Sequence, residues 1–331
     1  MSTFITGACG FVGLALAEHW LGAGEEVVGY DVQALPASAS ERFRALPGRY
    51  VHVRGNVCDA GALDRALGQH RPSRVVSLAA VTAGARRERG DPASIAQVNV
   101  AGAWNVLAAA AAHRVARVVH VSSGSAYGHS GRASARLHET DTPLQPEALY
   151  GITKHAAEAG ALRLADLYGL DVRVARLGTC FGPWEADTGV RDTLSAPLQA
   201  LHLAASGEAV VLPRDSRRDW LYVRDAAAGL AALAQAPVLH HSVYNVAAGF
   251  EWSMSAWCAY LQQAFPTADW RVAVDGEDAN IDYYAPYDRA SMDIGRLCAD
   301  TGFVPRYDLP AAADDYLAWF RAQNAAQRSA P

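Results

Sequence analysis

The 331-residue sequence predicts an α/β fold, with a doubly wound parallel sheet and a smaller, interleaved C-terminal lobe. Short apolar runs rich in β-branched residues alternate with alanine-rich stretches of helical length through the first half of the chain. This alternation is typical of a parallel sheet with helices on both faces, which binds ligands at the carboxyl ends of its strands. Beyond Gly178 the alternation weakens, and a mixture of Gly, Pro, Trp and charged residues predicts a substrate-binding lobe.

The elements of the first half follow one another without long interruptions. Six strands are expected, at Phe4–Thr6, Val27–Tyr30, Tyr50–Val53, Val75–Ala80, Val118–Ser122 and Val172–Leu177. Two alanine-rich helices are expected, from about Asp91 to His113 and from about Leu149 to Tyr168. Because alanine permits close helix approach, these helices also predict a homodimer seam, although helix propensity alone explains the same composition.

The second half is expected to return in part to the sheet. We predict a helix near Leu194–Ala205, a strand at Ala209–Leu212, a return motif at Arg218–Asp225 and a helix at Ser253–Phe265. We therefore assign residues 1–177 to a cofactor-binding domain, to which residues 215–248 return, and residues 178–214 and 249–325 to the substrate lobe. Residues 326–331 are expected to be a tail, with disorder from about Gln323 to Pro331.

A glycine-rich turn directly after the first apolar run predicts a dinucleotide site. The spacing of Gly7, Gly10 and Gly13 suits a tight turn, close approach of a pyrophosphate and close packing of the next helix, whose amide groups face the phosphates. Asp31 lies 18 residues beyond Gly13 at the end of the second strand. A carboxylate there accepts both ribose hydroxyls of NAD and repels the 2′-phosphate of NADP, so the sequence predicts NAD as the cofactor. The strand before the glycines, the helix after them and this acid make an ordinary glycine-rich turn the less favoured interpretation.

Composition argues against several other classes of protein. The net charge of -5, without a run of basic residues, gives no electrostatic footprint for nucleic acid or an anionic membrane. No apolar stretch is expected to approach the roughly 20 residues that span a bilayer, and no signal peptide is expected, so we predict a cytoplasmic protein. The five cysteines are scattered without a CxxC pair and the 11 histidines lack ligand spacing, so neither disulfides nor a metal are expected.

Tyr150 and Lys154 form a tyrosine–lysine pair on one helical face. A phenol with a pKa near ~10 is a poor base at neutral pH, but a nearby ammonium lowers that pKa. Upstream, the strand Val118–Ser122 leads into Ser123, whose hydroxyl could bond the substrate oxygen that Tyr150 deprotonates. The alternative is a surface tyrosine beside a solvated lysine. The pair follows a strand that ends in serine by one β-α unit, and this position disfavours the alternative.

Taken together, these residues resemble the extended short-chain dehydrogenase/reductases, in the NAD-dependent epimerase/dehydratase group that includes UDP-galactose 4-epimerase. The resemblance covers nearly the whole chain, through the return motif Arg218–Asp225, and implies a Rossmann-type domain that binds NAD. Relatives usually carry Asp where this chain has Asn56, whose amide oxygen can still bond the adenine amino group. The cofactor contacts that the resemblance implies are Gly7, Gly10, Phe11, Val12, Gly13, Asp31, Asn56, Val57, Leu78, Ala79, Ala80, Asn99, Tyr150 and Lys154.

The resemblance also implies hydride transfer between a sugar-type hydroxyl and NAD. Tyr150 would take the hydroxyl proton while Ser123 holds the oxygen and the hydride leaves the same carbon. A nucleotide-sugar epimerase is our first choice, and an NAD-dependent dehydrogenase of a free sugar or sugar acid, with net NADH formation, is the alternative. A non-catalytic NAD-sensing protein is a third reading, against which the intact Ser123, Tyr150 and Lys154 set argues. Dehydration is disfavoured, because Gly124 and Ser125 stand where related dehydratases carry an acid pair.

The expected substrate contacts are Thr82, Ser123, Ser125, Thr179, Thr193, Arg218 and Arg289. Arg218 matches an arginine that grips a nucleotide-sugar diphosphate in the epimerases, which favours a sugar nucleotide as the small-molecule partner. A structural ion pair with Asp215, Asp219 or Asp225 would explain the same arginine equally well.

Other features of this region favour a different substrate. Thr179 and Thr193 stand where epimerases usually carry asparagines, and Arg289 comes later than a second expected arginine. Arginines 191, 217 and 289 could instead receive the carboxylate of a sugar acid. Trp184 and Trp220 could stack on a sugar, although core packing is the default for each tryptophan.

Overall fold

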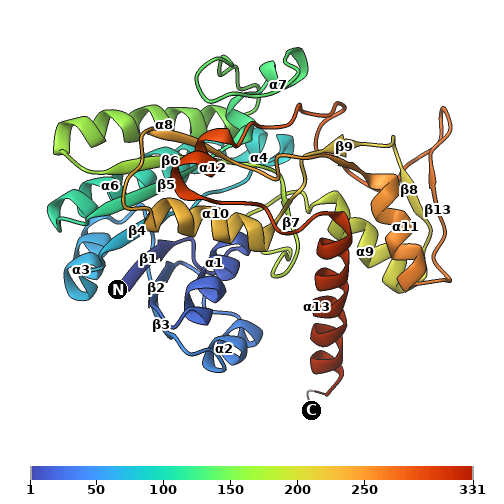
Figure 1. Cartoon of the computed structure of the whole chain (residues 1–331), viewed down its shortest axis with the longest axis horizontal. Helices are drawn as coiled ribbons and strands as arrows, with labels where there is room; N and C mark the ends of the chain where they lie inside the picture. Colours follow the sequence, from blue (N-terminus) through green and yellow to red (C-terminus); the bar gives the residue numbers. More distant parts are fainter. Residues whose placement is uncertain (1, 330–331) are drawn as a thin grey trace.

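A parallel sheet of seven strands forms the centre of the structure, a computed structural model that describes residues 2–329 (Figure 1). The strands lie in the order β11-β6-β5-β4-β1-β2-β3. They are β1 (Ser2–Thr6), β2 (Glu26–Asp31), β3 (Arg49–Arg54), β4 (Arg74–Ser77), β5 (Arg117–Ser123), β6 (Val172–Leu177) and β11 (Val243–Val246). The order reverses between β1 and β4, so a ligand crevice is expected at the carboxyl ends of these two strands.

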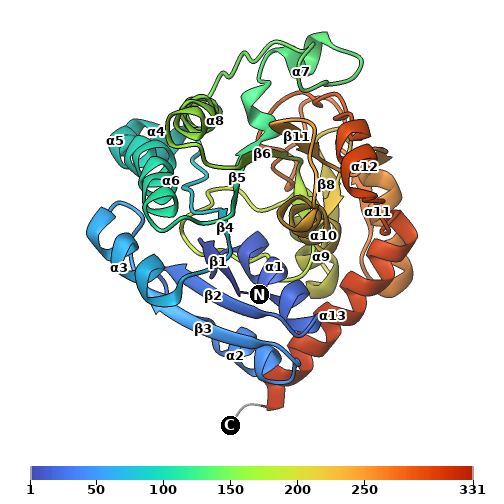
Figure 2. The same cartoon turned by 60° about the vertical axis from the view of Figure 1, so that its left-hand side comes forward.

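Successive residues of the central strands pack on opposite faces of the sheet. Phe4 and Val75 are fully buried against the layer that contains α3 (Ala60–His70) and α6 (Ala103–Ala112). Ile5 and Val76 are fully buried in the other core, which includes residues of α1 (Phe11–Gly22) and α10 (Val223–Gln235). Figure 2 shows the two helix layers on either side of the sheet. Covering both faces explains why these strands are mostly apolar and have buried residues on both faces of the sheet.

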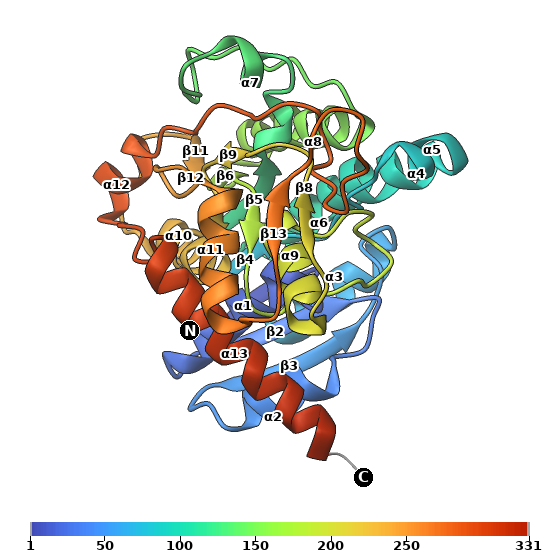
Figure 3. The same ribbon diagram turned by 90° about the vertical axis from the view of Figure 1, so that its right-hand side faces the viewer.

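The smaller lobe lies beside the sheet and has a core of its own (Figure 3). It contains α9 (Ala196–Ser206), β8 (Val210–Leu212), α11 (Met254–Ala264), β13 (Trp270–Val272) and α13 (Leu309–Ser329). Aromatic rings fill its centre: the ring of Phe181 lies 5.8 Å from that of Trp257 and 6.3 Å from that of Tyr316, in edge-on contacts. Helix α10 and strand β11 lead the chain back to the large sheet.

Short elements connect these two parts and line their junction. Strand β7 (Cys180–Phe181) pairs with β10 (Leu221–Tyr222), and β9 (Arg217–Arg218) pairs with β12 (Trp252–Ser253). The remaining elements are α2 (Ala37–Arg44), α4 (Ala85–Gly90), α5 (Pro92–Ala96), the π-helical η1 (Gln97–Gly102), the 3-10 helix η2 (Gly124–Ala126), α7 (Ser130–Ala133), α8 (Leu149–Tyr168) and α12 (Gly295–Thr301).

Several predicted elements need correction. The strand expected to run to Ala80 ends at Ser77, because the Thr6 hydroxyl accepts hydrogen bonds from the amide groups of Leu78 and Ala79 at 3.2 and 3.3 Å and turns the chain away. The single helix expected from Asp91 consists of α5, η1 and α6. The disorder expected from Gln323 is wrong as far as Ser329, where α13 ends; residues 330–331 lie outside the described residues.

The stretch Pro92–Ala112 also corrects an expectation drawn from hydropathy. Its 21 residues are long and apolar enough to cross a membrane by length and composition alone, and 44% of its most apolar window is buried inside the fold. In this structure the stretch packs against α3 and α8 in one of the helix layers of the sheet. A core helix passes the same test, so the finding is weak evidence for a membrane span.

Candidate active site

A cavity of 790 Å³ opens at the carboxyl ends of the sheet strands and extends to the smaller lobe. Its wall is made by the turn after β1 and the ends of β2, β4, β5 and β6, with the first turns of α8 and segments of the second lobe. All the predicted cofactor and substrate residues line it except Asn99. The fold therefore brings together residues as distant in sequence as Gly7 and Arg289.

The glycine turn at one end of the cavity leaves no room for a side chain at Gly7 or Gly13. Gly7 has φ +71°, and a Cβ there would lie 2.8 Å from the backbone of Ala79. A Cβ at Gly13 would lie 2.3 Å from the carbonyl oxygen of Gly7, in the turn from which α1 begins. Gly10 donates its amide to that same oxygen at 3.1 Å. The turn thus places backbone directly against the cavity, where a pyrophosphate can approach it.

Two polar side chains follow at the ends of β2 and β3. Asp31 accepts the amide of Cys9 at 2.9 Å through one oxygen and the amide of Gln33 at 2.9 Å through the other, so it is tied to the glycine turn. Asn56 accepts the amide of Cys58 at 2.9 Å, which occupies one lone pair of the amide oxygen assigned to adenine. Val57 is buried beside it and packs against Gly102 of η1.

Asn99 is buried and is not among the residues that line the cavity, so its assignment as a cofactor contact stays a prediction. Its amide oxygen accepts the Val81 amide at 2.7 Å. Its amide nitrogen donates to the Val81 carbonyl and to the Thr153 hydroxyl, each at 3.0 Å. With these bonds Asn99 fixes the loop after β4 to helix α8, and so acts on the site through Val81.

Ser123 and Tyr150 meet where β5 ends and α8 begins. Ser123 is 8% exposed, and its hydroxyl accepts the Ser125 amide at 3.1 Å as the cap of η2. Burial raises the pKa of Tyr150, while hydrogen bonds with the side chains of Ser123 and Thr82 lower it. The nearby charge of Arg191 also lowers the pKa of Tyr150. A half-buried phenol with two hydroxyl partners is suited to hold the oxygen of an alcohol substrate.

Lys154 is buried one turn further along α8. Its ammonium donates a hydrogen bond to the carbonyl of Val121, on β5. Burial lowers the pKa of Lys154 to about 8, and the carboxylate of Glu158 opposes that shift. Arg191 is a cation whose charge lowers the pKa of Tyr150 in this structure, and the same effect expected of Lys154 stays a prediction.

A segment of residues 184–193, the crossing segment, passes over the glycine turn and is tied down at both ends. The Trp184 indole is buried and donates to Glu18 of α1 at 2.7 Å, so this tryptophan packs in the interior. At the other end, Asp192 accepts the Gly84 amide at 2.7 Å and bonds the Arg87 guanidinium at 2.7–2.9 Å. The crossing segment therefore joins the second lobe to the loop after β4.

Arg191 belongs to the crossing segment and reaches into the cavity. Its guanidinium lies 3.0 Å from the buried carboxylate of Glu185 and bonds the Thr193 carbonyl at 2.9 Å. It also lies 5.8 Å from the ring centre of Phe11 in the glycine turn. Both carboxylate oxygens of Glu185 in turn accept from Ser195, the N-cap of α9. This chain of contacts fixes Arg191 between the dinucleotide end of the cavity and Tyr150.

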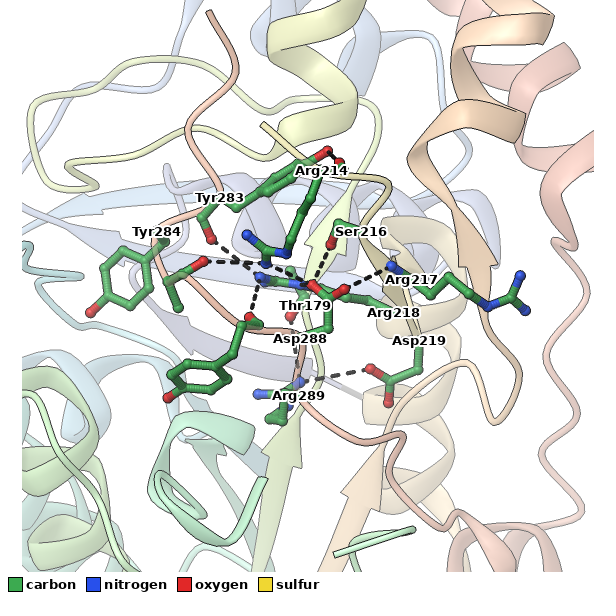
Figure 4. Close-up of polar contacts among 12 residues, drawn as sticks. Thr179, Arg214, Ser216, Arg217, Arg218, Asp219, Tyr283, Tyr284, Asp288 and Arg289 are labelled. Atoms are coloured by element: carbon green, nitrogen blue, oxygen red, sulfur yellow. Dashed lines mark hydrogen bonds and ion pairs between the residues drawn. The ribbon is translucent and has the colours of Figure 1, made fainter. Parts of the chain in front are cut away.

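Arg218 lies at the far end of the cavity, where the loop of residues 283–288 holds its guanidinium (Figure 4). Its Nε lies 3.3 Å from Asp288, and its Nη2 donates to the carbonyls of Tyr283 and Tyr287 at 3.3 and 3.2 Å. The guanidinium also lies 5.4 Å from the ring centre of Trp220, which is 2% exposed. An ion pair is therefore present, although its partner is Asp288 and not one of the three aspartates considered from the sequence.

Arg289 enters the cavity beside Gly124, the residue after Ser123. Its Nη2 lies 3.4 Å from the Thr179 hydroxyl and 3.8 Å from the carboxylate of Asp219, as Figure 4 shows. Burial raises the pKa of Asp219 to about 6, against the opposing charge of Arg289. Thr193 lines the same cavity, on the crossing segment. Among the residues that the structure describes, no group of three or more His, Cys, Asp and Glu side chains could hold a metal ion.

Sequence reasoning missed several residues of this cavity. Tyr283, Tyr284 and Tyr287 line it from a loop that has no motif of its own. Arg191 was considered only for a carboxylate, although it lies close enough to Tyr150 to affect its pKa. The one available signal was the density of arginine and tyrosine in the two loops of the second lobe.

A cavity with a dinucleotide-type glycine turn at one end and a buried serine and tyrosine at the other defines a class of dinucleotide-dependent enzymes that act on alcohols. Comparisons with known proteins identify the family. The sequence matches the NAD-dependent epimerase/dehydratase family over residues 3–247, and the chain belongs to this family, as the resemblance in its motifs predicted. It is thus an NAD-dependent enzyme of the extended short-chain dehydrogenase/reductase type.

Individual relatives differ in the reaction named for them. The chain is 31% identical over 324 residues to a dTDP-glucose 4,6-dehydratase of Streptomyces griseus, covering 96% of this chain and 93% of the relative. It is 30% identical over 245 residues to a probable UDP-glucuronate 4-epimerase of Rhizobium meliloti, covering 72% and 69%. Relatives of both kinds are thus similar to this chain, and the family alone does not decide between epimerisation and dehydration.

Solved structures repeat the architecture over almost the whole chain. MoeE5 in complex with UDP-glucose and NAD is 25% identical, with a TM-score of 0.77 over 98% of this chain and 100% of that one. UDP-glucose 4-epimerase from Thermotoga maritima has a TM-score of 0.81 over 98% and 100%, and its 21% identity shows the shared fold alone.

Proposed function

We propose that this protein is a nucleotide-sugar epimerase, in which NAD is restored within each catalytic cycle. The observation that carries the proposal is the residue after the catalytic serine: it is Gly124, and the Arg289 guanidinium occupies the space beside it. Elimination of water needs a proton donor and a base next to the reacting carbon. A guanidinium can serve as neither the acid nor the base at neutral pH, because it keeps its own protons and accepts none.

The carboxylates elsewhere in the cavity support the same choice. Within the described residues, the acids that line it are Asp31, Glu147 and Asp282. Asp31 serves the dinucleotide end. Glu147 is bonded to Arg132 and accepts from Tyr287 at 2.9 Å, and Asp282 accepts the amide of Tyr284 at 2.7 Å. Each acid has a partner, and none stands directly after Ser123, where the chain has Gly124 and Ser125.

In the proposed reaction the side chains around Tyr150 hold the substrate and move its proton. The hydroxyls of Ser123 and Thr82 orient the reacting sugar oxygen, and the phenolate form of Tyr150 takes the proton of that oxygen and becomes the phenol. Lys154, held at the Val121 carbonyl, and the glycine turn position NAD, which supplies hydride acceptance and return when bound. The phenol of Tyr150 would then give the proton back to the same oxygen, which restores the phenolate.

A nucleotide fits the remainder of the cavity. Beyond the serine and tyrosine, the wall continues to Arg218, Trp220 and Tyr283, which combine a cation with flat apolar surfaces. Such a surface suits a diphosphate and a base. The relatives named above act on UDP- or dTDP-sugars, which supports a nucleotide-linked substrate here.

A dehydrogenase of a free sugar acid is the second candidate, favoured by the state of Arg218. Its Nε and Nη2 are already engaged by Asp288 and by two carbonyls, which leaves fewer donors for a diphosphate. A small acid would not need those donors.

The two candidates and dehydration are separated by product analysis. Purified protein with NAD is incubated with UDP-glucose, UDP-glucuronate, dTDP-glucose and free glucuronate, while absorbance at 340 nm and proton NMR are followed. Epimerisation predicts a new sugar anomeric signal with no lasting rise in NADH. Stoichiometric NADH from free glucuronate would establish the dehydrogenase instead, and a 4-keto-6-deoxy product would establish dehydration.

We also propose that two copies associate through the layer formed by α6 and α8. These helices pack together, with the Trp104 indole bonded to the Ala157 carbonyl at 3.4 Å over Gly160. Trp104, Ile152 and Leu167 are 39%, 42% and 57% exposed on them, which is apolar surface that a second copy would cover. Sedimentation at working concentration should give a dimer mass, and a monomer would remove the proposal. A cytoplasmic location stays a prediction.

A further inference from the structure

The side chain of Arg289 lies in a cradle made by two glycines. A Cβ at Gly124 would lie 2.7 Å from its Cζ, and a Cβ at Gly131 would lie 2.6 Å from its Cγ. Any other residue at either position would displace this arginine. Because Gly124 follows Ser123 directly, the cradle delivers a guanidinium to the neighbourhood of the catalytic hydroxyls.

Of the arginines in the cavity, Arg289 is the least neutralised. Arg191 and Arg218 lie 3.0 and 3.3 Å from the carboxylates of Glu185 and Asp288, and both also donate to backbone carbonyls. Arg289 lies 3.8 Å from its acid, Asp219, and its buried Nε has no hydrogen-bond partner within the part of the chain that the structure describes. An under-satisfied buried guanidinium gains most from an anion that brings two acceptor oxygens.

The position of Arg289 decides which anion that is. In a hexopyranose that reacts at C4, the substituent on the adjacent C5 lies near the reacting oxygen, whereas the phosphate on C1 lies across the ring. Ser123 and Tyr150 mark the reacting oxygen, and Arg289 stands on the residue next to Ser123. A negative charge on the sugar itself, at C6, therefore meets Arg289, while the C1 phosphate would lie on the far side.

We infer that Arg289 is the receptor for a C6 carboxylate, so that the preferred sugar is a hexuronic acid. The inference rests on the proposed nucleotide-sugar function and narrows its substrate class. Thr179 completes the receptor, since its hydroxyl lies within 3.4 Å of the same guanidinium and can donate to the second carboxylate oxygen. A neutral C6 hydroxymethyl group would leave the Nε of Arg289 buried and unbonded, which disfavours the corresponding hexose.

The test compares ligands that differ only at C6. Calorimetric titrations on the NAD-loaded protein measure the dissociation constants of UDP-glucuronate, UDP-glucose and UDP. We expect UDP-glucuronate to bind at least tenfold more tightly than UDP-glucose. Arg289→Met should remove this difference while leaving the affinity for UDP within twofold, and Arg289→Lys should restore part of it, because a lysine keeps the charge without the two-pronged geometry.

A neighbouring arginine provides the matched control. Arg217 is exposed and points away from the cluster in Figure 4, and it does not line the cavity. Arg217→Met should leave all three affinities unchanged. Thermal melting and NAD binding of each variant establish that it is folded.

The outcomes separate this inference from the epimerase proposal. If Arg289→Met weakens UDP, UDP-glucose and UDP-glucuronate equally, Arg289 is a diphosphate ligand and the inference is overturned, although the epimerase proposal survives. A wild-type protein without a preference for UDP-glucuronate over UDP-glucose overturns it as well. If no nucleotide binds, titrations with free glucuronate and glucose decide between the remaining outcomes. A preference for glucuronate that depends on Arg289 would support the carboxylate receptor and overturn the nucleotide-sugar proposal. The lack of such a preference would overturn both proposals.

Discussion

Arg176 and Glu158 form an ion pair directly behind Lys154, with side chains 5% and 4% exposed. Arg176 also bonds the Tyr127 hydroxyl at 2.9 Å, and that hydroxyl donates to Asn245 on β11 at 2.8 Å. The carboxylate of Glu158 raises the pKa of Lys154 against the effect of burial. A network that links β6 and β11 to helix α8 thus helps to keep Lys154 charged near neutral pH.

Replacing Glu158 with Gln tests this connection. Loss of the carboxylate should move the pKa of Lys154 below about 8, so that the alkaline fall in NAD affinity occurs at a lower pH than in the wild-type protein. The change also leaves Arg176 buried without its partner, which should lower the free energy of unfolding by ~3–5 kcal/mol. NAD titrations from pH 6 to 9.5 and urea unfolding measure the two effects. The exposed pair of Glu26 and Arg49 supplies the control, since Glu26→Gln should cost under ~1 kcal/mol.

Tyr150→Phe removes the phenolic oxygen and little else. Turnover should fall by roughly 10²–10⁴-fold, the contribution expected of a positioned proton-transfer group. NAD affinity should stay within a few-fold, because the glycine turn and Asp31 are untouched. Single-turnover kinetics and NAD titration measure the two quantities. Unchanged turnover would show that Tyr150 is not the base.

Gly7→Ala and Gly24→Ala separate backbone strain from loss of the dinucleotide turn. Both glycines have positive φ, at +71° and +79°. A Cβ at Gly24 meets open space, so its cost should be the ~1–2 kcal/mol of a left-handed conformation. A Cβ at Gly7 also meets the Ala79 backbone at 2.8 Å, so NAD binding should be lost as well. Equal effects of the two substitutions on NAD affinity would contradict the assigned role of the turn.

Asp219 should make carboxylate binding depend on pH. Its pKa is raised to about 6, so it gains a proton as the pH falls from 7.5 to 5.5 and ceases to compete for Arg289. Affinity for UDP-glucuronate should then rise by roughly tenfold, ~1.4 kcal/mol, a fraction of the ~4 kcal/mol attraction of unit charges near 4 Å. UDP-glucose affinity should not follow this change. Asp219→Asn keeps an acceptor for the Met292 amide and should abolish the pH dependence.

The same proton affects stability with a defined sign. Because burial raises the pKa of Asp219 in the folded state, the folded protein binds more protons than the unfolded chain between the ordinary carboxyl pKa of ~3.9 and about 6. The contribution of Asp219 to stability is therefore full below the lower value and is lost as the pH rises through about 6. A comparison of wild-type and Asp219→Asn unfolding over this range measures that contribution.

Local patterns made much of the fold predictable. The glycine spacing, the acid at the end of β2 and the apolar strands depend on residues close in sequence, and the parallel sheet that contains β1 to β6 is expected from their regular alternation with helices. The end of α13 was missed because Gln323 to Ser329 lack apolar periodicity, although alanine and glutamine favour helix.

The parts that could not be predicted depend on contacts between distant segments. Arg289 lies against Gly124, 165 positions earlier, and Arg218 pairs with Asp288, 70 positions later, and neither pairing leaves a pattern in the sequence. Asn99 matched a cofactor position by motif, but its partners Val81 and Thr153 became visible only in three dimensions. The motifs predict Ser123 and Tyr150 as the catalytic pair, whereas the proposed substrate rests on tertiary contacts.

The crossing segment bears on how often the protein must meet a new NAD molecule. Its Arg191 contacts Phe11 of the glycine turn, and its Asp192 bonds the Gly84 amide and the Arg87 guanidinium. We expect these contacts to slow the release of a dinucleotide bound at the glycine turn. If the protein is the epimerase proposed above, it regenerates its own oxidant and does not need such release, so NAD should accompany the protein through purification as a resident part of the enzyme.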